Sequence, residues 1–121
     1  MPDPDHLLVS ITTNTLEEAE KIAQALVEER LAACVNIAPA IISIYRWQGE
    51  IHIDSEVLLI AKSRSELFDS LAARVKDLHS YEVPEIIALP IVAGSKSYLK
   101  WIEESVQEEI GEETALHLDE S

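Results

Sequence analysis

Cysteine is almost absent from this sequence, since Cys34 is the only one in 121 residues. A single thiol excludes a disulfide within the chain and a zinc site built from several cysteines. The residues on either side, Ala33 and Val35, are apolar, and a free cysteine in such a setting usually packs as a small hydrophobic side chain. We interpret Cys34 as a packing residue rather than a nucleophile.

Glycine is also scarce, and its three positions, Gly49, Gly94 and Gly111, are far apart. Such spacing provides no glycine-rich phosphate loop, and the chain contains no GxSxG nucleophile motif. The sequence therefore predicts a protein that is not an enzyme and that requires no cofactor.

Positive charge is scarce as well. Nine Lys and Arg residues face 23 Asp and Glu residues, the formal net charge is −14, and no Lys or Arg follows Lys100. A surface with this charge repels phosphate backbones, so we expect no nucleic-acid partner. The acidic end of the chain is interpreted as a solubilising surface.

Long apolar runs are missing too. The longest, IIALPIVA at residues 86–93, is far shorter than the roughly 18 residues of a membrane span. The N-terminal MPDPDHLLV has acidic residues and prolines where a signal peptide has basic residues. We expect a cytoplasmic protein without membrane contact, forming a single domain over residues 1–121 with flexible tails at 1–6 and 110–121.

The first half of the chain predicts a strand, a helix and a long hairpin. Residues 7–13 (LLVSITT) are rich in branched side chains, which is typical of a strand. Thr15 and Glu18 have the spacing of a capping box, which predicts a helix to about Arg30. Residues 33–47 and 50–62 then read as two extended arms joined at Gln48 and Gly49.

The second half repeats the strand and helix pattern. Ser63 and Glu66 also have capping-box spacing and predict a helix that ends near His79. Residues 85–92 read as a strand, Gly94 and Ser95 interrupt it, and a third helix is expected to extend to about Val106.

This order predicts an α+β fold. Right-handed crossovers turn β-α-β-β-α-β into a ferredoxin-like sandwich with an antiparallel sheet of order 4-1-3-2, followed here by a C-terminal helix. Pro39 and Pro90 would then lie in the two edge strands, where a missing N–H is tolerated. Hairpin arms of about 40 Å and two open edges predict assembly with further copies of the chain.

The stretch HSYEVPE at residues 79–85 contains the densest group of polar side chains. Imidazole nitrogen and carboxylate oxygen suit Cu(II), and His79 and Glu85 are the two candidate metal ligands. The alternative is an ordinary loop after a helix, with His79 near the negative end of the helix dipole. From the residues alone, both interpretations remain open.

A second group lies at the expected hairpin tip, at Tyr45, Arg46 and Trp47. Aromatic side chains beside an arginine are enriched at protein interfaces. They are also suited to line a small-molecule cleft, but burial at an interface is the favoured interpretation.

Several blocks of the sequence resemble the CutA divalent-cation tolerance family. They are RLAACVNI (30–37), YRWQGEI (45–51), EVLLIAKS (56–63), YEVPEIIALPI (81–91) and SYLKWIEESV (97–106), and the similarity covers roughly residues 7–108. The resemblance implies a ferredoxin-like homotrimer with paired hairpins. It also implies a cytoplasmic, non-enzymatic protein linked to copper tolerance.

The resemblance further implies copper binding by a cysteine near the first strand and by a loop reading HPYEVPE. This chain has no cysteine in LLVSITT and has Ser80 where the family usually has proline. Of the implied metal ligands, only His79 and Glu85 are carried over, with Tyr81 nearby.

Three hypotheses follow. The first is a trimer in metal response that binds Cu(II) or another divalent cation weakly through His79 and Glu85. The second is a sensor similar to the PII signal proteins, with a ligand cleft between subunits. The third is a trimeric scaffold that anchors a partner and has no ligand. The residues proposed for the intersubunit cleft are Tyr45, Arg46, Trp47, Lys62 and Tyr81.

Overall fold

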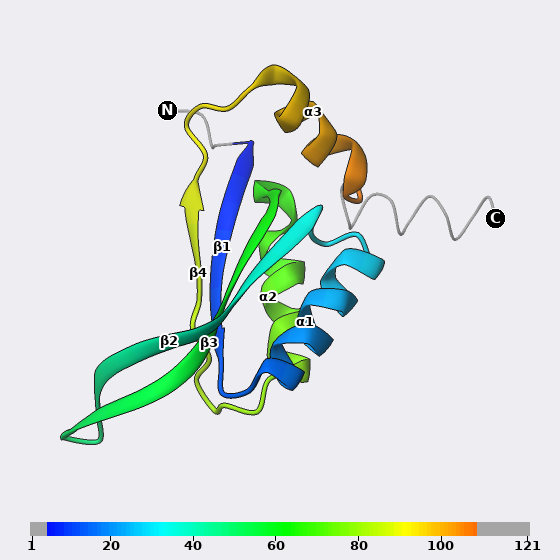
Figure 1. Cartoon of the computed structure of the whole chain (residues 1–121). Coiled ribbons are helices and arrows are strands. Elements are labelled where there is room, and N and C mark those ends of the chain that lie inside the picture. The colour runs from blue at the N-terminus through cyan, green and yellow to red at the C-terminus, as the bar shows by residue number, and fades with distance from the viewer. Residues whose placement is uncertain (1–4, 109–121) are drawn as a thin grey trace.

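The computed structural model describes residues 5–108. Within these residues, four strands and three α-helices follow one another (Figure 1). Their order is β1 (His6–Thr13), α1 (Leu16–Glu28), β2 (Cys34–Trp47), β3 (Glu50–Arg64), a 3₁₀ turn (Ser65–Leu67), α2 (Phe68–Leu78), β4 (Ile86–Pro90) and α3 (Lys96–Ser105).

The strands form one antiparallel sheet in the order β2-β3-β1-β4. This is the predicted order 4-1-3-2 read from the other edge, so the predicted α+β topology is confirmed. Helices α1 and α2 cover one face of the sheet (Figure 1). The core lies between these two layers and includes the fully buried Val9, Ile11, Ile22, Leu26, Leu59, Leu71 and Val75.

The β2–β3 hairpin extends well beyond the rest of the sheet (Figure 1). Its turn lies at Gln48 (φ 52°) and Gly49 (φ 83°), as predicted. Two successive residues in the left-handed region match the right-handed twist of the arms. The register of β2 against β3 shifts between Ala38 and Ile41, around Pro39, which cannot donate to the ladder.

The second predicted capping box is wrong. Ser63 lies inside β3, opposite Leu7 of β1, and is fully buried. Its hydroxyl donates to the carbonyl oxygen of Leu31 at 2.7 Å. Pairing with β1 extends β3 through Arg64, and the chain enters α2 by a 3₁₀ turn without a side-chain cap. The long-range strand ladder thus overrides a local capping signal.

The two edge strands carry the prolines, as predicted: Pro39 in β2 and Pro90 at the last position of β4. Strand β4 spans Ile86–Pro90 and is therefore shorter at both ends than the predicted 85–92. The third helix begins after Ser95, whose hydroxyl accepts the N–H of Tyr98 at 3.3 Å.

The N-terminal strand begins at His6, which was expected to belong to a flexible tail. His6 is buried, and its Nε2 lies 2.8 Å from Oε2 of Glu103 on α3. Of the predicted tails, residues 1–4 and 110–121 lie outside the described residues. Over residues 5–108, no helix has the length and apolar character needed to span a bilayer.

Candidate functional site

A cleft of about 600 Å³ lies where the loop after α2 meets the end of β1 and the hairpin. Its volume falls within the range of small-molecule sites, about 300–1,000 Å³. Strand β1, both hairpin strands and the loop contribute to its wall. The lining residues are Thr12, Ser43, Ile44, Tyr45, Trp47, Glu56, Tyr81, Glu82, Val83 and Glu85.

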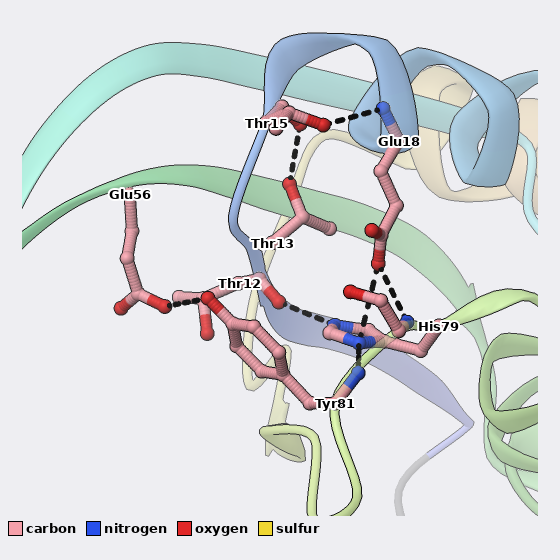
Figure 2. Close-up of polar contacts among 8 residues, drawn as sticks. Thr12, Thr13, Thr15, Glu18, Glu56, His79 and Tyr81 are labelled. Atoms are coloured by element: carbon pink, nitrogen blue, oxygen red, sulfur yellow. Dashed lines mark hydrogen bonds and ion pairs between the residues drawn. The ribbon is translucent and has the colours of Figure 1, made fainter.

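The His79 side chain lies inside the fold behind this cleft and has no exposed surface. Its Nε2 is 2.7 Å from the carbonyl oxygen of Thr12, and its Nδ1 accepts the backbone N–H of Tyr81 at 3.0 Å (Figure 2). An accepting Nδ1 assigns the proton to Nε2, which then donates to Thr12. Both ring nitrogens are therefore engaged in holding the loop against β1.

Glu18 connects the same loop to helix α1. Thr15 caps this helix as predicted, since its hydroxyl accepts the N–H of Glu18 at 3.1 Å. The Glu18 side chain instead accepts the backbone N–H of Ser80 at 3.0 Å and lies 3.3 Å from His79 Nδ1 (Figure 2). The predicted capping box thus has only its first half, and the carboxylate stabilises the cleft loop.

Tyr81 links the loop to the hairpin. Its hydroxyl donates to Oε2 of Glu56 at 2.7 Å (Figure 2), and Glu56 is only 9% exposed. Burial, together with the hydrogen bond to the Glu56 carboxylate, raises the pKa of Tyr81 well above its ordinary value. The hydrogen bond to Glu56 holds the Tyr81 ring in a defined position on the cleft wall.

Glu85 is exposed and lines the cleft, where its carboxylate accepts the hydroxyl of Ser10 at 2.8 Å. The structure therefore separates the two proposed metal ligands, because His79 is enclosed behind the loop while Glu85 faces the cleft. In residues 5–108, no three His, Cys, Asp or Glu side chains are placed to hold one metal ion.

Of the residues of the hairpin that were proposed for the cleft, the aromatic ones line it and the cationic ones do not. Tyr45 and Trp47 line the cleft together with Tyr81. Arg46 reaches the carbonyl oxygen of Gly49 at 3.4 Å, and Lys62 contacts Asn36 and Cys34 of the neighbouring strand. Neither cation is among the residues that line the cleft.

Tyr45 is held by two further contacts. Its hydroxyl donates to Asp54, and its ring stacks on His52 with centroids 5.5 Å apart. The hydrogen bond to Asp54 raises the pKa of Tyr45. The Tyr45 ring is thus held in a defined position on the cleft wall.

Several lining residues were not predicted as site residues: Thr12, Ser43, Ile44, Glu56, Glu82 and Val83. The detectable signal was the polar alternation of His52, Asp54 and Glu56 in an otherwise apolar arm. Which of these side chains meets the loop depends on sheet register, and a single-strand pattern does not contain that information.

The far part of the hairpin carries an exposed apolar surface, which we call the isoleucine stripe. Ile44 and Ile53 are directly opposite one another, and Ile42 and Ile51 occupy the same face by the two-residue period. These four side chains are 63–75% exposed. Contiguous exposed apolar surface is typical of surfaces that bind another molecule.

Comparison with known proteins finds a match between residues 7–105 and a family model described as CutA1 divalent ion tolerance protein. A divalent-cation tolerance protein CutA of Thermus thermophilus is 56% identical over 98 residues, which cover 81% of this chain and 95% of that protein. A chloroplastic CutA of Arabidopsis thaliana is 46% identical over 101 residues, 84% of this chain but 56% of the longer relative.

Solved structures agree. A divalent cation tolerance protein of Thermus thermophilus superposes with a TM-score of 0.83 at 54% identity, covering 84% of this chain and 99% of that one. A CutA1 of Oryza sativa gives 0.84 at 44% identity, with 87% and 96% covered.

Proposed function

Since the chain belongs to the CutA1 divalent ion tolerance family, we propose that it acts in the response to divalent cations, as a cytoplasmic homotrimer and without catalysing a reaction. The observation that carries the proposal is the family match over residues 7–105. The names of the relatives state divalent-cation tolerance, and the fold of this chain is theirs.

Two surfaces support assembly from three copies. The isoleucine stripe leaves four branched apolar side chains in water in a single chain, and the edge strand β4 exposes Ile87 and Leu89 at 56% each. Covering such surfaces with another copy recovers hydrophobic free energy and removes the open edges. The interface has to be strongly apolar, because each added copy brings a net charge of −14.

Cu(II), or another divalent cation, is the proposed ligand, with Glu85 and His79 as the proposed protein groups. Glu85 is exposed at the cleft and offers a carboxylate. His79 offers nitrogen only if its ring gives up the contacts to Thr12 and Tyr81. That competition supports weak binding, since the loop contacts have to be lost when the ring is used as a ligand.

The test is calorimetric titration of the full chain with Cu(II). Glu85→Gln is expected to weaken the strongest binding step about tenfold or more. The matched control is Glu28→Gln, an exposed helical glutamate on α1 that lies outside the cleft, and it should leave the isotherm unchanged. A His79→Ala/Glu85→Ala double variant that remains folded and gives the wild-type isotherm would remove both residues from the proposal.

A second candidate function is small-molecule sensing in the manner of the PII signal proteins. The observation that favours it is the aromatic cleft, which is wide enough for an organic ligand. The hairpin turn contains only Gln48 and Gly49, so this chain lacks the long loop of PII proteins there. A metabolite screen by thermal shift tests this candidate. It would be excluded if copper gave a clear shift and none of the metabolites did.

A further inference from the structure

The walls of the cleft combine negative charge with aromatic rings. Glu56, Glu82 and Glu85 contribute carboxylates, and no Lys, Arg or His is among the lining residues. With the chain at a net charge of −14, such a cleft disfavours nucleotides and other phosphate ligands and favours a cation.

Three aromatic side chains, Tyr45, Trp47 and Tyr81, line the same cleft. In the single chain, Trp47 is 44% and Tyr45 41% exposed, so a ligand can reach their rings there. A ring face attracts a cation whose charge is spread over a weakly hydrated group, and a Trp ring does so more strongly than a Tyr ring. Aromatic walls thus select an organic cation within the cationic class.

The carboxylates are poorly arranged for a bare metal ion. Glu56 is held by the hydroxyl of Tyr81, and Glu85 is held by the hydroxyl of Ser10. No metal-holding group of three acidic, His or Cys side chains occurs over residues 5–108. An ammonium group needs only one or two carboxylates at the cleft wall together with a ring face.

We propose that this cleft binds a compact organic cation, a quaternary or primary ammonium compound, with its charge between the Glu56 and Glu85 carboxylates and its methyl or methylene groups on Trp47. The proposal rests on the second candidate function, since it names the ligand class of the same cleft. The hydrogen bonds that fix Tyr45 and Tyr81 reduce the ordering cost of binding.

The probe is choline, and its control is 3,3-dimethylbutan-1-ol, which has the same shape with carbon in place of the charged nitrogen. Saturation-transfer NMR on the full chain, titrated into the tens of millimolar, reports contact with the methyl protons. Choline is expected to give a saturable signal, and the neutral alcohol is expected to give none. Equal binding of the two compounds, or no choline signal, overturns the proposal.

Trp47→Leu should weaken choline binding about tenfold, and Trp47→Phe should restore part of it because a ring face returns. The matched control is Trp101→Leu, since Trp101 is 42% exposed but belongs to α3, away from the cleft. Light scattering on each variant checks that assembly is unchanged. Equal losses in Trp47→Leu and Trp101→Leu contradict the site.

The same samples titrated with Cu(II) separate this inference from the metal proposal. Trp47→Leu should leave the copper isotherm intact, since indole provides no metal ligand. If choline does not bind but copper binds in a Glu85-dependent way, the organic-cation site is refuted and the metal proposal stands. If choline binds and copper does not, the metal proposal is refuted and the organic-cation site stands.

Discussion

The carboxylate of Glu18 accepts the backbone N–H of Ser80 at 3.0 Å, across 62 residues of sequence. Glu18 lies in the first turn of α1, and Ser80 lies in the loop that forms one wall of the cleft. The loop pattern HPYEVPE of the CutA family has proline at the position of Ser80, and proline has no N–H to donate. This chain therefore has a tie between helix and loop that a proline-containing loop cannot form.

The first prediction concerns that tie. Glu18→Ala should reduce the free energy of unfolding by about 1–3 kcal/mol, because the Ser80 N–H loses a charged acceptor. Glu17→Ala is the matched control, since Glu17 lies in the same helical turn but is exposed. Urea unfolding measures both, and equal losses would mean that only the helix dipole is involved.

The second prediction tests the same bond by non-additivity. The backbone of His79 is already extended (φ −87°, ψ 143°), as a residue before proline requires, so Ser80→Pro is expected to fold. Glu18→Ala should then cost about 1 kcal/mol less in the Ser80→Pro background than in the original chain. Additive losses in the urea unfolding of the four proteins would show that the Ser80 N–H contributes nothing.

The third prediction concerns pH. Tyr81 has a folded-state pKa raised from 10.0 by burial and by its bond to Glu56. The folded state therefore retains a proton that the unfolded state loses above pH 10, so stability is fully present below pH 10 and falls as the pH rises further. Thermal unfolding between pH 9 and about pH 11 should show this decline.

Tyr81→Phe provides the comparison. The variant should be less stable by about 1–2 kcal/mol at neutral pH, since Glu56 loses a hydrogen-bond donor. Its decline above pH 10 should also be shallower than that of the original chain. Parallel pH curves for the two proteins would assign the alkaline loss to other groups.

The fourth prediction concerns assembly. Ile44→Glu places a charge in the isoleucine stripe, opposite Ile53, and is expected to convert the proposed trimer into monomers because the carboxylate would be buried without a partner. Val27→Glu is the control, since Val27 is an exposed β-branched residue on α1 (42%). Light scattering measures the molar mass of both variants, and only Ile44→Glu is expected to lower it. An unchanged mass for Ile44→Glu would place the interface elsewhere.

Most of the architecture could be predicted from the sequence because local signals and topology agree. The Thr15 cap and the Gln48–Gly49 turn are set by short-range chemistry, and the edge positions of Pro39 and Pro90 follow from the strand order. All three are confirmed. The candidate site depends on register and loop closure instead. The enclosure of His79 follows from contacts with Thr12 and Glu18, more than 60 residues away, and a strand or helix pattern does not contain such contacts.

At Ser63 the local sequence pattern and the structure differ most clearly. Read locally, Ser63 is a helix cap exposed to water, and its loss would fray α2. In the structure it is fully buried in β3 and donates to the carbonyl oxygen of Leu31. Ser63→Ala is therefore expected to cost about 1–3 kcal/mol by leaving that buried acceptor without its donor.

Ser55→Ala is the control, because Ser55 is exposed on the same strand and should change stability by less than about 0.5 kcal/mol. Urea unfolding followed by circular dichroism measures both variants. Amide exchange in Ser63→Ala should accelerate around Leu31, where the hydrogen bond is lost. If exchange accelerates only at the start of α2, the capping interpretation is correct and the assigned hydrogen bond is not.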